Sequence, residues 1–158
     1  HMRQSKNHTV IFIILIILSI LLSIPKTYQL DALLGPLLDF EEMSFFLSHR
    51  SFFILLGLFL EFMGTALSIV IIKYVYHFAK INLSLIQNAN IYLFISCLIK
   101  VITLILPIMI TSKLPFLNNL LFSILFVAIH HLLNKEYSKK QWIYLSAYPL
   151  VNLLLGFL

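Results

Sequence analysis

Long apolar runs separated by short polar or charged segments dominate the pattern of this chain. A helix needs about 20 mostly apolar residues to cross the hydrocarbon of a bilayer, and backbone groups in lipid leave few alternatives to helix. Five runs have this character: residues 9–24, 51–76, 89–111, 117–134 and 142–158. We therefore predict an all-α fold, a polytopic bundle of five transmembrane helices.

The segment after the first run has a helical pattern of its own. Its leucines recur at helical spacing: Leu30, Leu33, Leu34, Leu37 and Leu38. Its polar and small residues fall together on the other face: Asp31, Gly35, Asp39 and Glu42. This pattern predicts a short amphipathic helix on the outer membrane surface, bent or restarted at Pro36. A second interpretation of the acidic face is a lip that gathers cations.

Composition supports a membrane protein. Of the 158 residues, 61% are hydrophobic and 11% are charged, and the mean hydropathy is +1.00. Such a chain has too few polar residues to cover the surface of a water-soluble globule. Residues 1–158 are predicted to form a single membrane domain. Because no small-residue cleavage site follows the first run, we interpret that run as a retained signal anchor.

Lys and Arg between the runs set the predicted orientation. Seven lie on one side: Arg3, Lys6, Lys73, Lys80, Lys135, Lys139 and Lys140. Three lie on the other: Lys26, Arg50 and Lys113. The N-terminus is therefore predicted in the cytoplasm and the C-terminus outside a cell membrane, most simply a bacterial cytoplasmic membrane. We attribute the formal charge of +5 to the orientation of the chain in the membrane, so we expect no nucleic-acid partner.

Two ionisable residues lie deep inside the runs, where such residues are costly and mark pairing or function. Glu61 follows the outer start of the second run by ten residues, and Lys100 precedes the outer end of the third by about ten. Each depth is roughly 15 Å at the rise of an α-helix. We predict that Glu61 and Lys100 pair across two antiparallel helices, either to fix helix register or to form a proton- or substrate-binding centre.

Small and polar residues accompany this pair at helical spacing. On the second run they are Gly57, Glu61, Gly64 and Ser68, and on the third Ser96, Lys100, Thr103 and Pro107. Small residues let helices approach closely in membranes. A third stripe, on the last run, holds Leu145, Pro149, Asn152 and Gly156. The predicted binding or pairing residues are Glu61, Lys100, Gly57, Gly64, Ser68, Ser96, Thr103 and Asn152.

Other chemistry finds little support in the sequence. His130 and His131 are consecutive and point about 100° apart, so they do not chelate one metal as an i, i+4 pair does. We interpret them as imidazoles reaching the cytoplasmic surface. Cys97 is the one cysteine, and we interpret it as a small residue that is buried in lipid or at a helix interface. We predict no catalytic residue, no metal and no cofactor, hence no enzyme.

The order of these parts resembles the Yip family, five-span membrane proteins known in eukaryotes for interacting with Ypt/Rab GTPases. In residues 52–105 a long second span, a short basic turn and a polar restart lead into the third span. The closing "LFSILFVAIHHLLNKEYSKKQWIYLSAYPLVNLLLGFL" looks like the last helical pair of that family, joined by a Lys-rich turn. The resemblance implies a non-enzymatic membrane adaptor or organiser able to self-associate.

Two function classes stay open. The first is an integral membrane adaptor or accessory protein that acts through helix–helix or protein–lipid contacts, with the bilayer and a membrane protein or a second copy as partners. The second is a small transporter or substrate-binding component built on an intramembrane Glu61/Lys100 centre. Water reaching the pair through a cavity favours the second class, and a dry, closed bundle favours the first.

Overall fold

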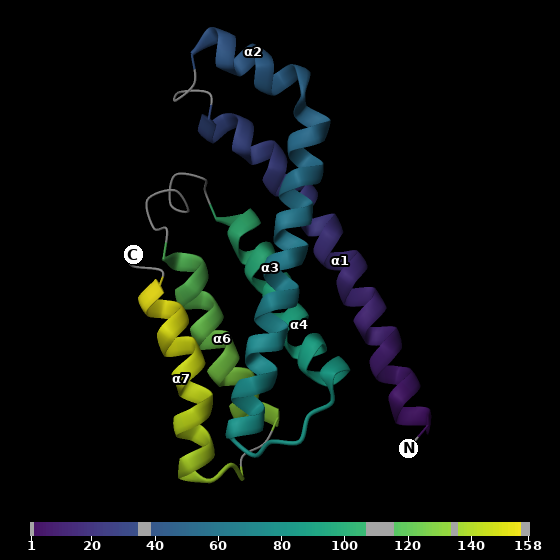
Figure 1. The fold of residues 1–158 in the computed structure, drawn as a ribbon, viewed down its shortest axis with the longest axis vertical. Helices are drawn as coiled ribbons and strands as arrows, with labels where there is room; N and C mark the ends of the chain where they lie inside the picture. The colour runs from purple at the N-terminus through teal and green to yellow at the C-terminus, as the bar shows by residue number, and fades with distance from the viewer. Residues whose placement is uncertain (1, 35–38, 107–115, 134–135, 156–158) are drawn as a thin grey trace.

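The computed structural model describes residues 2–34, 39–106, 116–133 and 136–155. These residues form six helices: α1 (Met2–Leu34), α2 (Phe40–Ser48), α3 (Arg50–Phe78), α4 (Leu85–Ile105), α6 (Leu117–Leu133) and α7 (Lys139–Leu155). The start of α1, the α3–α4 turn and the α6–α7 connection lie at one end of the bundle, so the long helices alternate in direction (Figure 1). The all-α prediction is confirmed.

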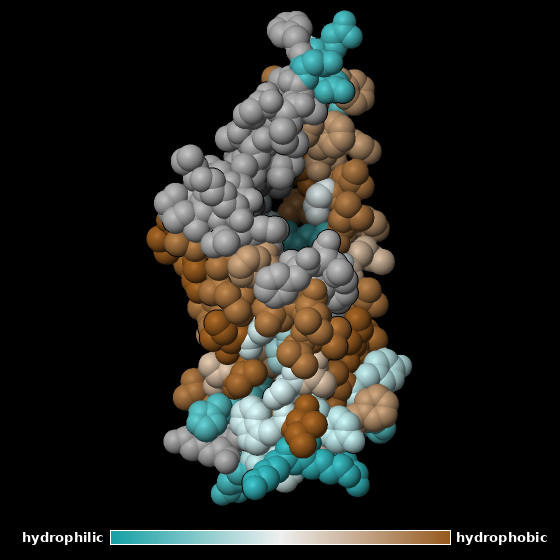
Figure 2. Space-filling model, turned by 90° about the vertical axis from the view of Figure 1, so that its left-hand side faces the viewer, coloured by the Kyte–Doolittle hydropathy of each residue, from teal (hydrophilic) through white to brown (hydrophobic). Residues whose placement is uncertain are grey.

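Three of these helices are long and apolar enough to cross a membrane. They are α1 over Asn7–Pro25, α3 over its whole length and α4 over its whole length. The fourth and fifth predicted spans correspond to α6 and α7, which have 17 residues each. In the face turned to the viewer in Figure 2, apolar side chains form a band across the middle and polar ones gather at the lower end.

The apolar part of α1, Asn7–Pro25, lies close to the first predicted span of 9–24, but the helix itself continues through Pro25 to Leu34. A proline removes a single helical hydrogen bond, whereas ending the helix in apolar surroundings leaves several backbone groups unpaired. The predicted amphipathic helix is also displaced. Its leucines up to Leu34 belong to α1, and residues 35–38 lie outside the described part of the chain.

The short helix in this segment is α2, and it starts at Asp39 rather than near Leu30. The backbone N–H of Glu42 donates to the Asp39 carboxylate (2.8 Å), and the Asp39 N–H donates to the Glu42 carboxylate (3.3 Å). This reciprocal pair is a capping box, which starts helices by satisfying their first free N–H groups. The two acids assigned to a polar helix face therefore form a helix start.

The third predicted span, 89–111, corresponds to α4, which is displaced toward the α3–α4 turn. It begins at Leu85 because Ser84 and Gln87 form a second capping box. It ends at Ile105, and Leu106 is extended, with ψ of 139°. A residue that precedes proline is pushed out of the helical region, and residue 107 is a proline. Residues 107–111 of the prediction lie outside the described residues.

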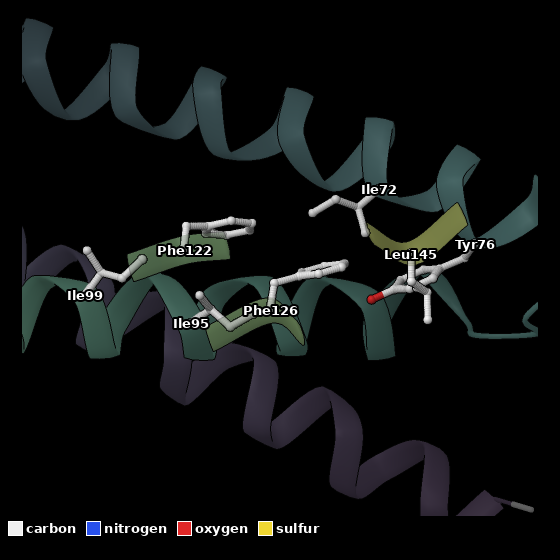
Figure 3. Packing of buried hydrophobic residues seen from close by; sticks show 7 residues of the cluster. All are labelled: Ile72, Tyr76, Ile95, Ile99, Phe122, Phe126 and Leu145. Atoms are coloured by element: carbon white, nitrogen blue, oxygen red, sulfur yellow. The ribbon is translucent and has the colours of Figure 1, made fainter. Parts of the chain in front are cut away.

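The hydrophobic core lies between α3, α4, α6 and α7, in the half of the bundle near the α3–α4 turn. Its buried residues are Ile72, Tyr76, Ile95, Ile99, Phe122, Phe126 and Leu145, and Figure 3 shows Phe122 and Phe126 between the helices. A smaller cluster of Leu15, Leu93 and Cys97 joins α1 to α4. Helix α4 thus holds the first helix on one side and the α6–α7 pair on the other.

Candidate functional site

The Lys100 ammonium forms the centre of a buried polar cluster. It makes an ion pair with Glu61 of α3. It also donates to the hydroxyl oxygens of Ser19 (2.7 Å) and Ser23 (2.7 Å), and to the Ser19 carbonyl (3.0 Å). The predicted pair is present, and the first helix supplies the rest of the coordination. One cation thereby ties α1, α3 and α4 together.

Ser23 connects the two charges. Its hydroxyl oxygen accepts from Lys100 and lies 3.0 Å from Glu61 Oε1 and 2.8 Å from the Ser19 carbonyl. A hydroxyl has one proton to give and two lone pairs to accept with. Ser23 therefore accepts from Lys100 while donating to one of these two oxygens. Its side chain is buried, so this hydroxyl is shielded from solvent.

The two partners of the ion pair differ in exposure. The Lys100 side chain is 7% exposed and the Glu61 side chain 38%. Within the described residues, each hydrogen bond and ion pair of Glu61 is made by Oε1. No described residue donates a hydrogen bond to the second carboxylate oxygen, Oε2. An unpaired carboxylate oxygen in apolar surroundings costs free energy, so it favours an additional donor.

Glu61 lines an open apolar groove between α1 and α3, about 450 Å³ in volume. The walls on α1 run from Phe12 to Ser23, those on α3 from Leu58 to Ile69, and Leu93 of α4 forms part of the floor. Each wall covers twelve residues of helix, and the eleven steps between its ends span roughly 16 Å. The polar groups lie at the end of the groove near Ser23, and the remainder is nearly all apolar.

The distances of Lys100 and Glu61 from the ends of their helices can be compared with the prediction. Since α4 ends at Ile105, Lys100 lies five residues, roughly 8 Å, from the end of that helix rather than ten. Glu61 lies eleven residues from the start of α3, near the middle of a 29-residue helix. The residues still meet because α3 extends beyond the end of α4, as Figure 1 shows. The predicted pairing is present, whereas residues 107–111, from which the depth of Lys100 was predicted, lie outside the described part of the chain.

The two glycines of the predicted stripe do not bring helices together. A Cβ atom added at Gly57 or Gly64 would meet nothing within 4 Å, and both residues are exposed. The close approach predicted there is therefore absent from the described structure. Thr103 is buried, but its hydroxyl donates to the Lys100 carbonyl one turn earlier (3.1 Å). It stabilises its own helix and does not extend the cluster.

Ser68, Ser96 and Asn152 meet elsewhere, around a polar chamber of about 220 Å³ between α3, α4, α6 and α7. Lys100 lines this chamber as well, so it separates the chamber from the groove that Glu61 lines. Helices α6 and α7 are joined beside it: Asn119 donates to the Asn152 carbonyl (2.9 Å), and Ser123 lies 2.9 Å from the Pro149 carbonyl. The stripe on α7 therefore faces α6.

His130 does not reach the cytoplasmic surface as predicted. It is buried, and its Nδ1 lies 2.7 Å from the Phe126 carbonyl. Since a carbonyl only accepts, Nδ1 carries the proton and Nε2 accepts from the Tyr76 hydroxyl at 2.5 Å. His131 is exposed. The described residues contain no group of three His, Cys, Asp or Glu side chains able to hold a metal ion.

The sequence analysis missed Ser19 and Ser23, although a signal for them exists. They are four residues apart in an otherwise apolar run, so they share one face of the first helix. It missed equally that α1 packs mainly along α4 rather than along its neighbour α3. Cys97 fits its prediction as an interface residue, since its thiol lies 3.7 Å from the Leu15 carbonyl of α1.

No family model, curated protein or solved structure matches this chain. The Yip resemblance therefore stays a prediction, and function is inferred from the geometry alone.

Proposed function

We propose that the chain is a non-enzymatic, multi-pass membrane accessory protein that holds a transmembrane helix of a partner protein in its α1/α3 groove. In this proposal α6 and α7 cross the bilayer together with the three longer helices, and the N-terminus lies in the cytoplasm. The excess of Lys and Arg at the end that carries Lys73, Lys80, Lys139 and Lys140 supports this orientation.

The observation that carries the proposal is the incomplete coordination of Glu61. Its Oε2 atom has no donor among the described residues, and its side chain is 38% exposed within the apolar groove. Inside a bilayer such a group is usually turned toward protein. A second helix laid in the groove would cover the apolar walls and bring a hydroxyl, amide or basic side chain to Oε2.

The depth of Glu61 favours a helix over a lipid headgroup as the donor. Glu61 is three residues, roughly 5 Å, from the middle of α3, which has 29 residues. Lipid headgroups lie at the two surfaces of a hydrocarbon layer about 30 Å thick. A side chain on a partner helix reaches the middle of that layer, whereas a headgroup does so only by leaving the interface. The occupant is therefore a polypeptide with a donor near its midpoint.

Site-specific photo-crosslinking in native membranes tests this proposal. A photoreactive phenylalanine analogue replaces Phe62, an exposed groove residue, or Phe94, an exposed residue of α4 outside the groove. We expect Phe62 alone to capture an apolar segment of another membrane protein. The captured segment should carry a donor side chain within one helical turn of the crosslinked residue.

A variant that fills the groove supplies the control. Ala66→Phe places a ring in the groove, whereas Ala147→Phe makes the same change on an exposed face of α7. Only the first should abolish the crosslink from Phe62. Capture of lipid alone, capture of a second copy of this chain, or survival of the crosslink in Ala66→Phe would each refute the proposal.

A second candidate function is a small transporter or substrate-binding component centred on Glu61 and Lys100. The polar chamber beside Lys100 is the observation that favours it. Against it, the ammonium already contacts four oxygens on the side facing away from the chamber. Substrate-dependent uptake by reconstituted vesicles, lost in Lys100→Met, would favour this candidate over the accessory protein.

A further inference from the structure

We propose that the polar chamber between α3, α4, α6 and α7 is a binding site for a small, uncharged, hydrogen-bonding solute about the size of glycerol. This proposal does not depend on the groove, because the chamber lies on the other side of Lys100 and shares none of its described lining residues with the groove.

The lining is polar on all four helices. Ser68 of α3, Ser96 of α4, Asn119 of α6 and Asn152 of α7 meet around the same hollow. Four separate apolar helices have each placed a hydroxyl or carboxamide group at this one level. Polar side chains inside helical membrane bundles are costly when dry and face partners or water. The convergence therefore marks a hydrated or ligand-binding interior.

Several of these groups have unused hydrogen-bonding capacity. Among the described residues, the Ser96 hydroxyl and the side-chain amides of Asn118 and Asn152 form no hydrogen bond. Asn119 donates one amide proton to the Asn152 carbonyl, so its second amide proton and its side-chain oxygen remain available for hydrogen bonds. The chamber thus offers donors and acceptors together, as a hydroxyl- or amide-bearing solute requires.

Charge excludes an ionic solute. Lys100 is the one charged residue in the described lining, and its charge is compensated by Glu61. An anion in the chamber would have to compete with a carboxylate already in contact, and a cation would meet the ammonium. An uncharged molecule avoids both costs.

The volume of the chamber indicates how large the solute is. The volume of about 220 Å³ lies below the roughly 300–1,000 Å³ of sites for drug-sized ligands and equals that of about seven waters. Its aromatic wall is held by ring contacts, since the Phe122 ring centroid lies 5.5 Å from that of Tyr92 and 5.9 Å from that of Tyr148. Asn118 is exposed, which places the mouth near the start of α6.

Cysteine labelling tests the proposal with glycerol as the solute. In a Cys97→Ala background, Ser96→Cys puts a thiol in the chamber and Ser44→Cys puts one on the exposed surface of α2. Iodoacetamide is the uncharged reagent and iodoacetate its charged analogue of similar size. We expect iodoacetamide to label both sites, while the rate ratio of iodoacetate to iodoacetamide falls about tenfold at Ser96→Cys relative to Ser44→Cys.

Glycerol should slow iodoacetamide labelling at Ser96→Cys by about twofold at half-saturation and leave Ser44→Cys unchanged. Asn152→Cys repeats the measurement from α7 in case the first variant does not fold. Labelling without protection by glycerol would mean that the chamber holds water only, and would overturn the proposal. Absence of labelling at both chamber positions, or an unchanged ratio of the two reagents, would overturn it as well.

Discussion

Removal of one charge from the Glu61/Lys100 pair should cost more than removal of both, and the structure allows the size of that effect to be worked out. Lys100→Met deletes the ion pair and three hydrogen bonds to oxygens of α1. It leaves the Glu61 carboxylate with Ser23 as its one donor among the described residues. Glu61→Gln removes the negative charge beside an ammonium that keeps its three oxygen partners on α1.

The two single substitutions should therefore lower the free energy of unfolding by different amounts. Stranding one partner of a buried pair costs about 3–5 kcal/mol, and the partial exposure of Glu61 places Lys100→Met near the lower figure. Loss of one hydrogen bond to a charged group costs about 1.5–3 kcal/mol, which applies to Glu61→Gln. The double variant leaves no charge and should cost less than either single change, which requires a coupling free energy of about 3 kcal/mol or more, the upper end of the range for residues in contact.

Reversible unfolding of the purified protein in mixed micelles, followed by helical circular dichroism, measures the four free energies of this cycle. Lys100→Met alone should be the least stable variant. If the two single effects add to within about 0.5 kcal/mol, the residues do not interact, and the coordination described for Lys100 is wrong. A larger loss for Glu61→Gln than for Lys100→Met would show that the Ser19 and Ser23 oxygens do not stabilise the ammonium once the carboxylate charge is gone.

Three further changes test other contacts in the same unfolding measurement. Ser23→Ala removes the hydroxyl between the charges and should cost about 1–2 kcal/mol; an unchanged stability would show that the bridge contributes nothing. Tyr76→Phe leaves the buried Nε2 of His130 without its donor and should cost about 1–3 kcal/mol, whereas Tyr74→Phe, at an exposed position, should change stability by less than about 0.5 kcal/mol. Gly64→Ala should raise stability by up to about 1 kcal/mol because alanine favours helix and the added Cβ meets nothing within 4 Å; a loss would reveal a packed neighbour.

Helix positions followed from hydropathy because each long apolar run leaves its backbone no polar partner outside the helix. The prediction of 51–76 for the second span lies within two residues of α3, and that of 117–134 within one residue of α6. Boundaries failed where local chemistry competed with hydropathy. The capping box at Ser84 and the proline after Leu106 displaced α4 toward the α3–α4 turn relative to the prediction, and both signals were present in the sequence.

The site was predictable only in part. A lone carboxylate and a lone ammonium in apolar runs must find partners, so pairing Glu61 with Lys100 required no structure. The contribution of Ser19 and Ser23 depended on α1 lying along α4, and no local pattern states which helices are neighbours. The stripe of Gly57 and Gly64 failed for the same reason, since helical spacing fixes a face but not what covers it.

By itself, the sequence determined that this chain is helical and has too few polar residues to cover the surface of a water-soluble globule. It also determined that the acid and the base inside its apolar runs form a pair. Only the tertiary structure decided that α1 completes the coordination of Lys100, that Glu61 lines a groove, and that polar residues of four helices line the chamber, which is open on one side. The physical reason is the distance along the chain over which each kind of interaction acts. Periodicity and hydropathy act within one helix, whereas hydrogen-bond satisfaction and cavity shape arise from how separate helices pack.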